Sequence, residues 1–287
     1  MNKLRIHTLV LVALILLIGF GCKPGQSNAS IPLVEIDTTA LDTIPVVEDV
    51  EEEIIEEQFN IPQNISYIRG RFNPKVHPDF MEIDSLHADR PDLYLRKDTY
   101  RAFVKMYEHA MADGIRLQIR SATRNFNVQK SIWEAKWTGE RLIEGGEDLS
   151  ETTPDPKERA LKILRYSSMP GTSRHHWGTD IDLNSFENSW FAEGEGLDIY
   201  NWLTEHAAEY GFCQPYSAGR PYGYFEERWH WSYMPVSAPL TAYAKENLKN
   251  EMIDGFLGSE SAVLIDVVKH YVLGINEKCS GEVSGEE

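Results

Sequence analysis

An acidic stretch without aromatic side chains limits how much of this chain can fold. Between Ile31 and Asn60 the sequence holds ten Asp or Glu residues and no Lys or Arg, and no aromatic residue occurs from Lys23 until Phe59. Such a segment buries too little apolar surface to offset its ordering entropy, so it predicts a flexible tether over residues 22–60. A short docked strand within it stays open, because some of its apolar residues alternate: Val34, Ile36, Ile44 and Val46.

The C-terminal end of the chain also has the composition of a disordered segment. The last residues, CSGEVSGEE, are small, polar and acidic. They predict a disordered tail over residues 277–287. The folded domain is expected to cover residues 61–276.

Residues 1–21 have the layout of an export signal. Two basic residues precede an unbroken apolar run from Leu9 to Phe20, which is shorter than the ~20 residues that a membrane-spanning helix needs. The residues up to Cys22 resemble a lipoprotein signal box, in which the cysteine is lipidated and becomes the mature N-terminus. We therefore expect a signal peptide, lipidation of Cys22 and a membrane-anchored lipoprotein in the periplasm or cell envelope. Ordinary secretion and an uncleaved anchor are the alternatives, because Phe20 is unusual inside such a box.

The composition argues against several classes of protein. A formal net charge of -17, from 28 basic and 45 acidic residues, disfavours a nucleic-acid partner, because phosphate binding needs a basic face. With 42% hydrophobic and 11% aromatic residues, the chain can bury a core. Three cysteines are too few for a disulfide scaffold or for paired CxxC clusters, so a metal site would use His and carboxylates. Whether Cys213 and Cys279 pair stays open.

The folded part has the pattern of an α+β domain. Periodicity and capping signals, with Asp98 and Asp155 as N-caps, predict helices at 98–114, 128–142, 155–166, 197–210, 240–247 and 261–273. Apolar residues alternate with polar ones at 115–119, which predicts a half-buried strand. Short strands separated by helices, without a regular βαβ order, favour a single domain with a small, mainly antiparallel sheet flanked by helices.

Two carboxylates share one face of a further predicted strand. In the segment TDIDL, the two-residue period of a strand places Asp180 and Asp182 on the same face. Burying either carboxylate without a partner is costly, so a metal ion or a strong donor is implied. His175 comes seven residues before Asp182, and Gly178 lets the chain bend between them. The imidazole can therefore reach the strand.

A second segment, rich in aromatic residues, supplies the remaining groups. His230 lies in it, and Glu227 precedes this histidine by three residues. Two imidazoles and one carboxylate, from His175, Asp182 and His230, form the three-ligand set with an open position that is typical of catalytic zinc. Zinc lowers the pKa of its bound water to about 7, and Glu227 can take the proton during attack on a carbonyl. Arg124 is the candidate cation for the growing oxyanion or for a substrate carboxylate.

These residues resemble the motifs of the VanY-type D-alanyl-D-alanine carboxypeptidases, which are zinc peptidases of bacterial cell walls. The first family motif has Ser, any residue, His, six residues and Asp, and it matches Ser173, His175 and Asp182. The second motif has Glu, any residue, Trp and His, and it matches the segment from Glu227 to His230. The joint occurrence of both motifs in the family's order makes the resemblance specific.

A third stretch extends the resemblance toward the N-terminus. The family has a serine, a small residue, an aromatic residue and an arginine, followed by a glutamine. The chain has Ser121, Ala122, Thr123 and Arg124, followed by Gln129, so Thr123 departs from the aromatic position. The resemblance runs from Ser121 to Tyr233 and implies a fold shared with the Hedgehog signalling domain.

The resemblance also implies roles for individual residues. The implied zinc ligands are His175, Asp182 and His230, the general base is Glu227, and the substrate contacts are Arg124, Ser173 and Gln129. Asp180 stands where the family usually has a small residue. We expect it to be a hydrogen-bond partner of a ligand histidine, with direct metal ligation as the alternative.

The implied activity is hydrolysis of peptidoglycan stem peptides with one zinc ion, most simply as a D-alanyl-D-alanine carboxypeptidase. A stem-peptide endopeptidase or dipeptidase of the same family is an alternative, because the sequence leaves open which end of the cleft is closed. A non-catalytic, zinc-containing wall-binding module is another. Glu227 favours the enzyme, because a binding module needs no base beside the metal.

Overall fold

A computed structural model describes residues 59–281 of the chain. The expected signal peptide, the lipidation site at Cys22 and nearly all of the expected tether lie outside these residues. The described part starts two residues before the expected domain boundary. The Phe59 ring packs edge-on against Tyr233, and the Asn60 carbonyl accepts a hydrogen bond from Arg96 at 3.0 Å.

The centre of the fold is a four-stranded antiparallel sheet of short strands. Its order is β3 (Ile119–Ser121), β4 (Asp180–Leu183), β6 (His230–Tyr233) and β5 (Phe212–Cys213). Every residue of β4 and β6 is buried, so helices and loops cover both faces. A separate hairpin-like pair, β1 (Phe80–Glu82) and β2 (Tyr94–Arg96), is also antiparallel. The expected α+β class with a small antiparallel sheet is confirmed.

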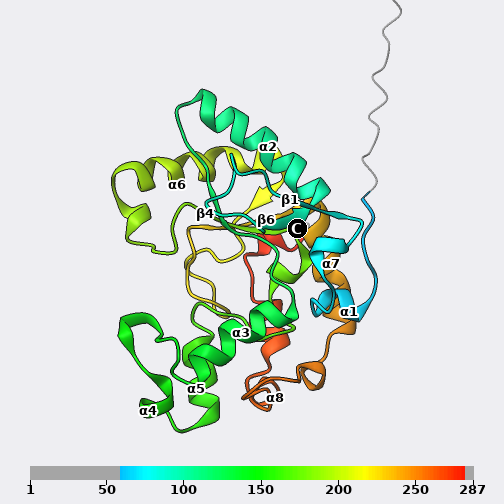
Figure 1. The fold of residues 1–287 in the computed structure, drawn as a ribbon, viewed down its shortest axis with the longest axis vertical. Helices are drawn as coiled ribbons and strands as arrows, with labels where there is room; N and C mark the ends of the chain where they lie inside the picture. Colours follow the sequence, from blue (N-terminus) through cyan, green and yellow to red (C-terminus); the bar gives the residue numbers. More distant parts are fainter. Residues whose placement is uncertain (1–58, 282–287) are drawn as a thin grey trace, which may run out of the picture. The chain divides into compact units, whose positions relative to one another are not determined.

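Helices surround this sheet. They are α1 (Ile65–Ile68), α2 (Lys97–Ala112), α3 (Phe126–Trp137), α4 (Leu149–Thr152), α5 (Pro156–Ile163), α6 (Gly194–His206), α7 (Met234–Asn247) and α8 (Ser261–Ile265). Figure 1 shows α2 and α6 together at one end of the sheet and α3, α5 and α8 at the other. Within residues 59–281, no helix is long and apolar enough to cross a membrane.

The capping and periodicity patterns predicted where the helices lie, but some of the predicted helix ends were wrong. Asp155 caps α5 by accepting a hydrogen bond from the Glu158 amide at 2.9 Å, as predicted. Asp98 does not cap α2, because it lies inside the first turn and pairs there with Arg96 at 2.6 Å. The helix predicted to reach residue 142 stops at Trp137.

The strand predicted for residues 115–119 begins only at Ile119. Leu117 and Ile119 are fully buried, as the alternation predicts. The stretch before Ile119 pairs instead with Asn184, whose side chain accepts from the Gln118 amide at 3.2 Å and donates to the Arg116 carbonyl at 2.8 Å. A side chain thus takes the place of a strand partner.

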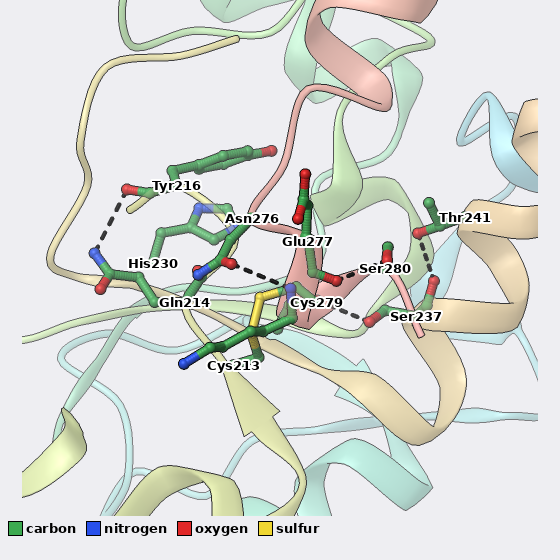
Figure 2. Close-up of a disulfide and its surroundings, with 12 residues drawn as sticks. Cys213, Gln214, Tyr216, His230, Ser237, Thr241, Asn276, Glu277, Cys279 and Ser280 are labelled. Carbon is green, nitrogen blue, oxygen red and sulfur yellow. Dashed lines mark hydrogen bonds between the residues drawn. A yellow bond between two sulfur atoms is a disulfide. The ribbon is translucent and has the colours of Figure 1, made fainter. Parts of the chain in front are cut away.

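The expected disordered tail is wrong for residues 277–281. A disulfide joins Cys213 of β5 to Cys279, which is fully buried in a 3-10 helix, Glu277–Cys279 (Figure 2). The Asn276 amide also donates to the Pro215 carbonyl at 2.8 Å. Polar composition suggested fraying, but a cross-link from a distant strand anchors this segment.

The disulfide predicts a stability difference. Replacing Cys279 by serine removes a cross-link between cysteines 66 residues apart, and the chain-entropy relation then gives a loss of about 4 kcal/mol in the free energy of unfolding. Urea unfolding of the wild type and of Cys279→Ser measures the loss, and the wild type in reductant should reproduce it. A loss below about 1 kcal/mol would show that the cross-link barely constrains the unfolded chain.

Candidate metal centre and active-site cleft

Two neighbouring strands and one turn bring the predicted ligands together. In the antiparallel register of β4 and β6, Asp182 lies opposite His230. His175 lies in the 3-10 helix Arg174–Trp177, which ends at Gly178 with a φ of 73°. A side chain at Gly178 would collide with Phe80, so only glycine lets the chain turn here and bring His175 over the strand.

The three side chains direct their ligand atoms at one another. The ligand atoms of His175, Asp182 and His230 all lie within 4.8 Å of one another, and all three residues are buried. Nε2 of His175 lies 3.2 Å from Oδ2 of Asp182, and Nδ1 of His230 lies 3.1 Å from Oδ1. Nevertheless, Nε2 of His175 and Oδ1 of Asp182 have no hydrogen-bond partner among the described residues. Close but unaligned donor atoms of this kind fit a shared cation.

The remaining nitrogen of each imidazole is held by a protein acceptor. Nδ1 of His175 lies 2.7 Å from the Ala122 carbonyl, and Nε2 of His230 lies 2.8 Å from the Asp180 carboxylate. These contacts orient the rings and leave Nε2 of His175 and Nδ1 of His230 toward the shared point, as in many metal sites. Asp180 thus lies behind His230 and is outside the group of possible ligands.

A buried arginine compensates the charge of Asp180. Nε of Arg174 donates to Asp180 at 3.1 Å, and the Ser232 hydroxyl donates to its other oxygen at 2.8 Å. Burial raises the pKa of the Asp180 carboxyl, but Arg174 and His230 outweigh it and lower the pKa below its ordinary value. Asp180 is therefore ionised and well placed to polarise His230.

The electrostatics of the centre favour a cation. Three buried carboxylates, from Asp180, Asp182 and Glu227, are accompanied by two guanidinium groups, from Arg124 and Arg174. Burial and the nearby Arg124 lower the pKa of His175, so its imidazole is neutral and free to coordinate. Burial lowers the pKa of the His230 imidazole, but its hydrogen bonds to Asp180, Asp182 and Glu227 outweigh burial and raise that pKa. The centre thus attracts positive charge at Nδ1 of His230, where a metal ion would take the place of a proton. The donor set, its charge and its unpaired atoms fit zinc.

Glu227 and Arg124 complete the centre, and both line a cleft of about 810 Å³. Oε2 of Glu227 lies 3.2 Å from Nδ1 of His230, and burial raises the pKa of the Glu227 carboxyl. One amino group of Arg124 donates to Ser121 at 2.7 Å and to Asp182 at 3.2 Å. A raised pKa suits a carboxylate that accepts and then returns a proton.

The structure separates the two other predicted substrate contacts. Gln129 lines the cleft, and its Nε2 donates to the Ser168 carbonyl at 2.8 Å while its Oε1 has no partner among the described residues. Ser173 is almost fully buried and does not line the cleft. It lies directly before the helix that carries His175.

Sequence reasoning missed two charged residues of the site. Arg174 is fully buried behind the metal centre, and Lys136 is 7% exposed in the wall of the cleft. Lys136 lies seven residues after Gln129, hence on the same face of α3. That spacing could have suggested it, but an isolated Lys or Arg in a helix is usually solvated.

Comparisons with known proteins agree with this geometry. A family model described as D-alanyl-D-alanine carboxypeptidase (VanY) matches residues 92–236, a range that contains every residue of the centre. A D-alanyl-D-alanine carboxypeptidase of Enterococcus faecalis is 27% identical over 143 residues, covering 48% of this chain and 47% of the relative. An uncharacterised protein of Haemophilus influenzae is 31% identical over 78 residues, covering 26% of this chain and 53% of the relative. The chain thus spans about half the length of these curated relatives.

Solved structures also resemble the chain. A zinc complex of a mutant of the vancomycin resistance D,D-pentapeptidase VanY is 19% identical, covers 66% of this chain and 92% of that chain, and has a TM-score of 0.43. The LdcB LD-carboxypeptidase is 18% identical, covers 66% of this chain and 79% of that chain, and has a TM-score of 0.44.

Proposed function

The chain belongs to the VanY family of D-alanyl-D-alanine carboxypeptidases, and from this premise we propose that it is a zinc-dependent peptidase that hydrolyses peptidoglycan stem peptides and releases a terminal D-alanine. The observation that carries the proposal is the convergence of His175, Asp182 and His230 beside the buried carboxylate of Glu227. A site for binding alone would need no such base.

One zinc ion would be held by Nε2 of His175, the Asp182 carboxylate and Nδ1 of His230. When bound, zinc supplies a Lewis acid and lowers the pKa of a water ligand to about 7. Asp180 and the Ala122 carbonyl keep both imidazoles in the orientation and tautomer that ligation requires.

Side chains of the cleft supply the proton transfer, the positive charge and the substrate contact that hydrolysis needs. Glu227 takes the proton of the attacking water and returns it to the leaving amine, and its raised pKa suits both steps. Arg124, at the edge of the cleft with 23% of its side chain exposed, offers a cation to the oxygen on which negative charge develops. The side-chain carbonyl oxygen of Gln129 has no hydrogen-bond partner in the part of the chain that the structure describes, and it fits a substrate amide N–H.

The proposal is tested by the masses of the products. The purified protein, loaded with zinc, is incubated with a stem pentapeptide that ends in D-Ala-D-Ala, and the products are measured by mass spectrometry. Loss of one alanine is expected. If the protein binds zinc and cuts no bond of the stem peptide, the proposed function is wrong.

We also propose that the enzyme works in the cell envelope and is anchored to the membrane through a lipid on Cys22. The basic and apolar start of the sequence and the acidic stretch after it support this location. Metabolic labelling with a fatty-acid analogue should mark the wild type and not Cys22→Ser. Equal labelling of both would exclude this anchor.

A further inference from the structure

Lys136 carries a buried ammonium group in the wall of the cleft. Its side chain lies in the wall that α3 contributes, and its Nζ donates to the Ser167 hydroxyl at 2.7 Å. Within residues 59–281, no carboxylate forms an ion pair with it. The buried Arg96 and Arg174, in contrast, pair with Asp98 at 2.6 Å and Asp180 at 3.1 Å.

The charge of this buried ammonium group is only partly compensated by the protein. Removing an ammonium group from water is costly unless an anion compensates it, and a single hydroxyl does so only in part. The burial of Lys136 accordingly lowers its pKa. An anion that enters the cleft would therefore gain a charge-assisted hydrogen bond from a donor that is already desolvated and held in place.

Lys136 lies in the same cleft as the groups that would act on the scissile bond, so an anion bound to it would lie near that bond. Lys136, Arg124 and Glu227 line the same cleft. After burial, the charges that act on the pKa of Lys136 are those of Glu144 and Arg141, then those of Glu227 and Arg124, and Glu144 acts without forming an ion pair with the ammonium. The carboxylate of a C-terminal residue lies only one residue, about 3.3–3.6 Å of chain, from the carbonyl that is cut. Arg124 already donates to Asp182 and Ser121. The ammonium of Lys136, in contrast, forms no ion pair with a carboxylate among residues 59–281.

On the basis of the proposed function, we propose that Lys136 binds the free C-terminal carboxylate of the substrate and so determines that the enzyme removes a terminal residue. A peptide that continues past this point, or ends in an amide, places a neutral group against the ammonium. Such a substrate leaves the buried charge uncompensated and binds less well. The specificity for chain ends thus comes from a residue that lies between the family motifs.

The test compares two peptides that differ only in charge. One is a stem pentapeptide with a free terminal carboxylate, and the other is the same peptide with a C-terminal amide. The zinc-loaded wild type should prefer the acid by about 10–100-fold in kcat/KM, the range expected for a hydrogen bond to a charged group. In Lys136→Met the acid should lose that advantage, mainly through KM, while the rate on the amide changes little.

Matched variants separate this role from a structural one. Lys130→Met, in the same helix but paired with Glu134 at 3.7 Å and the Gly255 carbonyl at 2.7 Å, should retain the wild-type preference. Lys136→Gln keeps a hydrogen-bond donor for Ser167 and serves if the methionine variant does not fold. Equal losses on acid and amide, or a wild type that cuts the amide as fast as the acid, would overturn the proposal.

Binding measurements distinguish failure of this inference from failure of the proposed function. Calorimetry on the Glu227→Gln protein needs no turnover. It should show tighter binding of the acid than of the amide, and this difference should vanish when Lys136→Gln is added. If the protein cuts no peptide but still discriminates in this way, the proposed hydrolysis fails and the role of Lys136 stands.

Discussion

Replacing Glu227 by glutamine should lower kcat for the stem pentapeptide by about 10²–10⁴-fold, the usual contribution of a general acid–base group. Glutamine keeps the size of the side chain and a hydrogen bond to His230, but it cannot accept the proton of the attacking water. Zinc content should stay at the wild-type level, because Glu227 is outside the group of three ligand atoms. Single-turnover hydrolysis together with metal analysis measures both quantities.

Glu226 provides the control for this variant. It is the preceding residue, and it pairs with Arg228 at 3.5 Å rather than with the metal centre. Glu226→Gln should therefore hydrolyse the peptide at nearly the wild-type rate. A Glu227→Gln protein that matches this control in kcat would remove Glu227 from the mechanism.

Removing the His230 imidazole should abolish zinc binding and activity together. In His230→Ala the ion would keep only His175 and Asp182 as ligands. Asp180 would lose the imidazole with which it forms a hydrogen bond. The zinc content after dialysis should fall from about one ion per chain to nearly none, because binding needs the complete, correctly oriented set of ligands. Elemental analysis and peptide hydrolysis on the same sample measure the two losses.

His270 is a suitable control, because its Nδ1 lies 2.7 Å from the Ile265 carbonyl and it is in no group of possible metal ligands among the described residues. His270→Ala should retain zinc and activity. If His230→Ala and His175→Ala both retained a full equivalent of zinc, the ion would lie elsewhere in the protein.

The sequence was most informative where function depends on residues close together in the chain. The spacing in TDIDL placed Asp180 and Asp182 on one face of a strand, and β4 has that conformation with both carboxylates buried. The motif around His175 and the one around His230 each named a candidate ligand. Their relevance could be predicted because a strand period and a glycine turn are local properties of the backbone.

The sequence was least informative about contacts between distant segments. The composition of the C-terminal segment predicted disorder, because no local sequence pattern indicates that Cys279 forms a disulfide with Cys213 of β5. Ser173 matched a family motif and yet lies outside the lining of the cleft. The strand before Ile119 was shortened by the side chain of Asn184, which comes from the far end of β4.

Motif spacing therefore predicted which residues offer zinc-binding and proton-transfer chemistry, because ligand type and strand period can be inferred from neighbouring residues alone. The packing of separate elements settled what surrounds them. It placed Asp180 behind His230 and outside the group of possible metal ligands, and it paired Arg174 with Asp180. It also buried the ammonium of Lys136 beside the Ser167 hydroxyl, without an ion pair to a carboxylate among residues 59–281. Burial and charge compensation arise from segments far apart in the chain, so only the folded structure shows them.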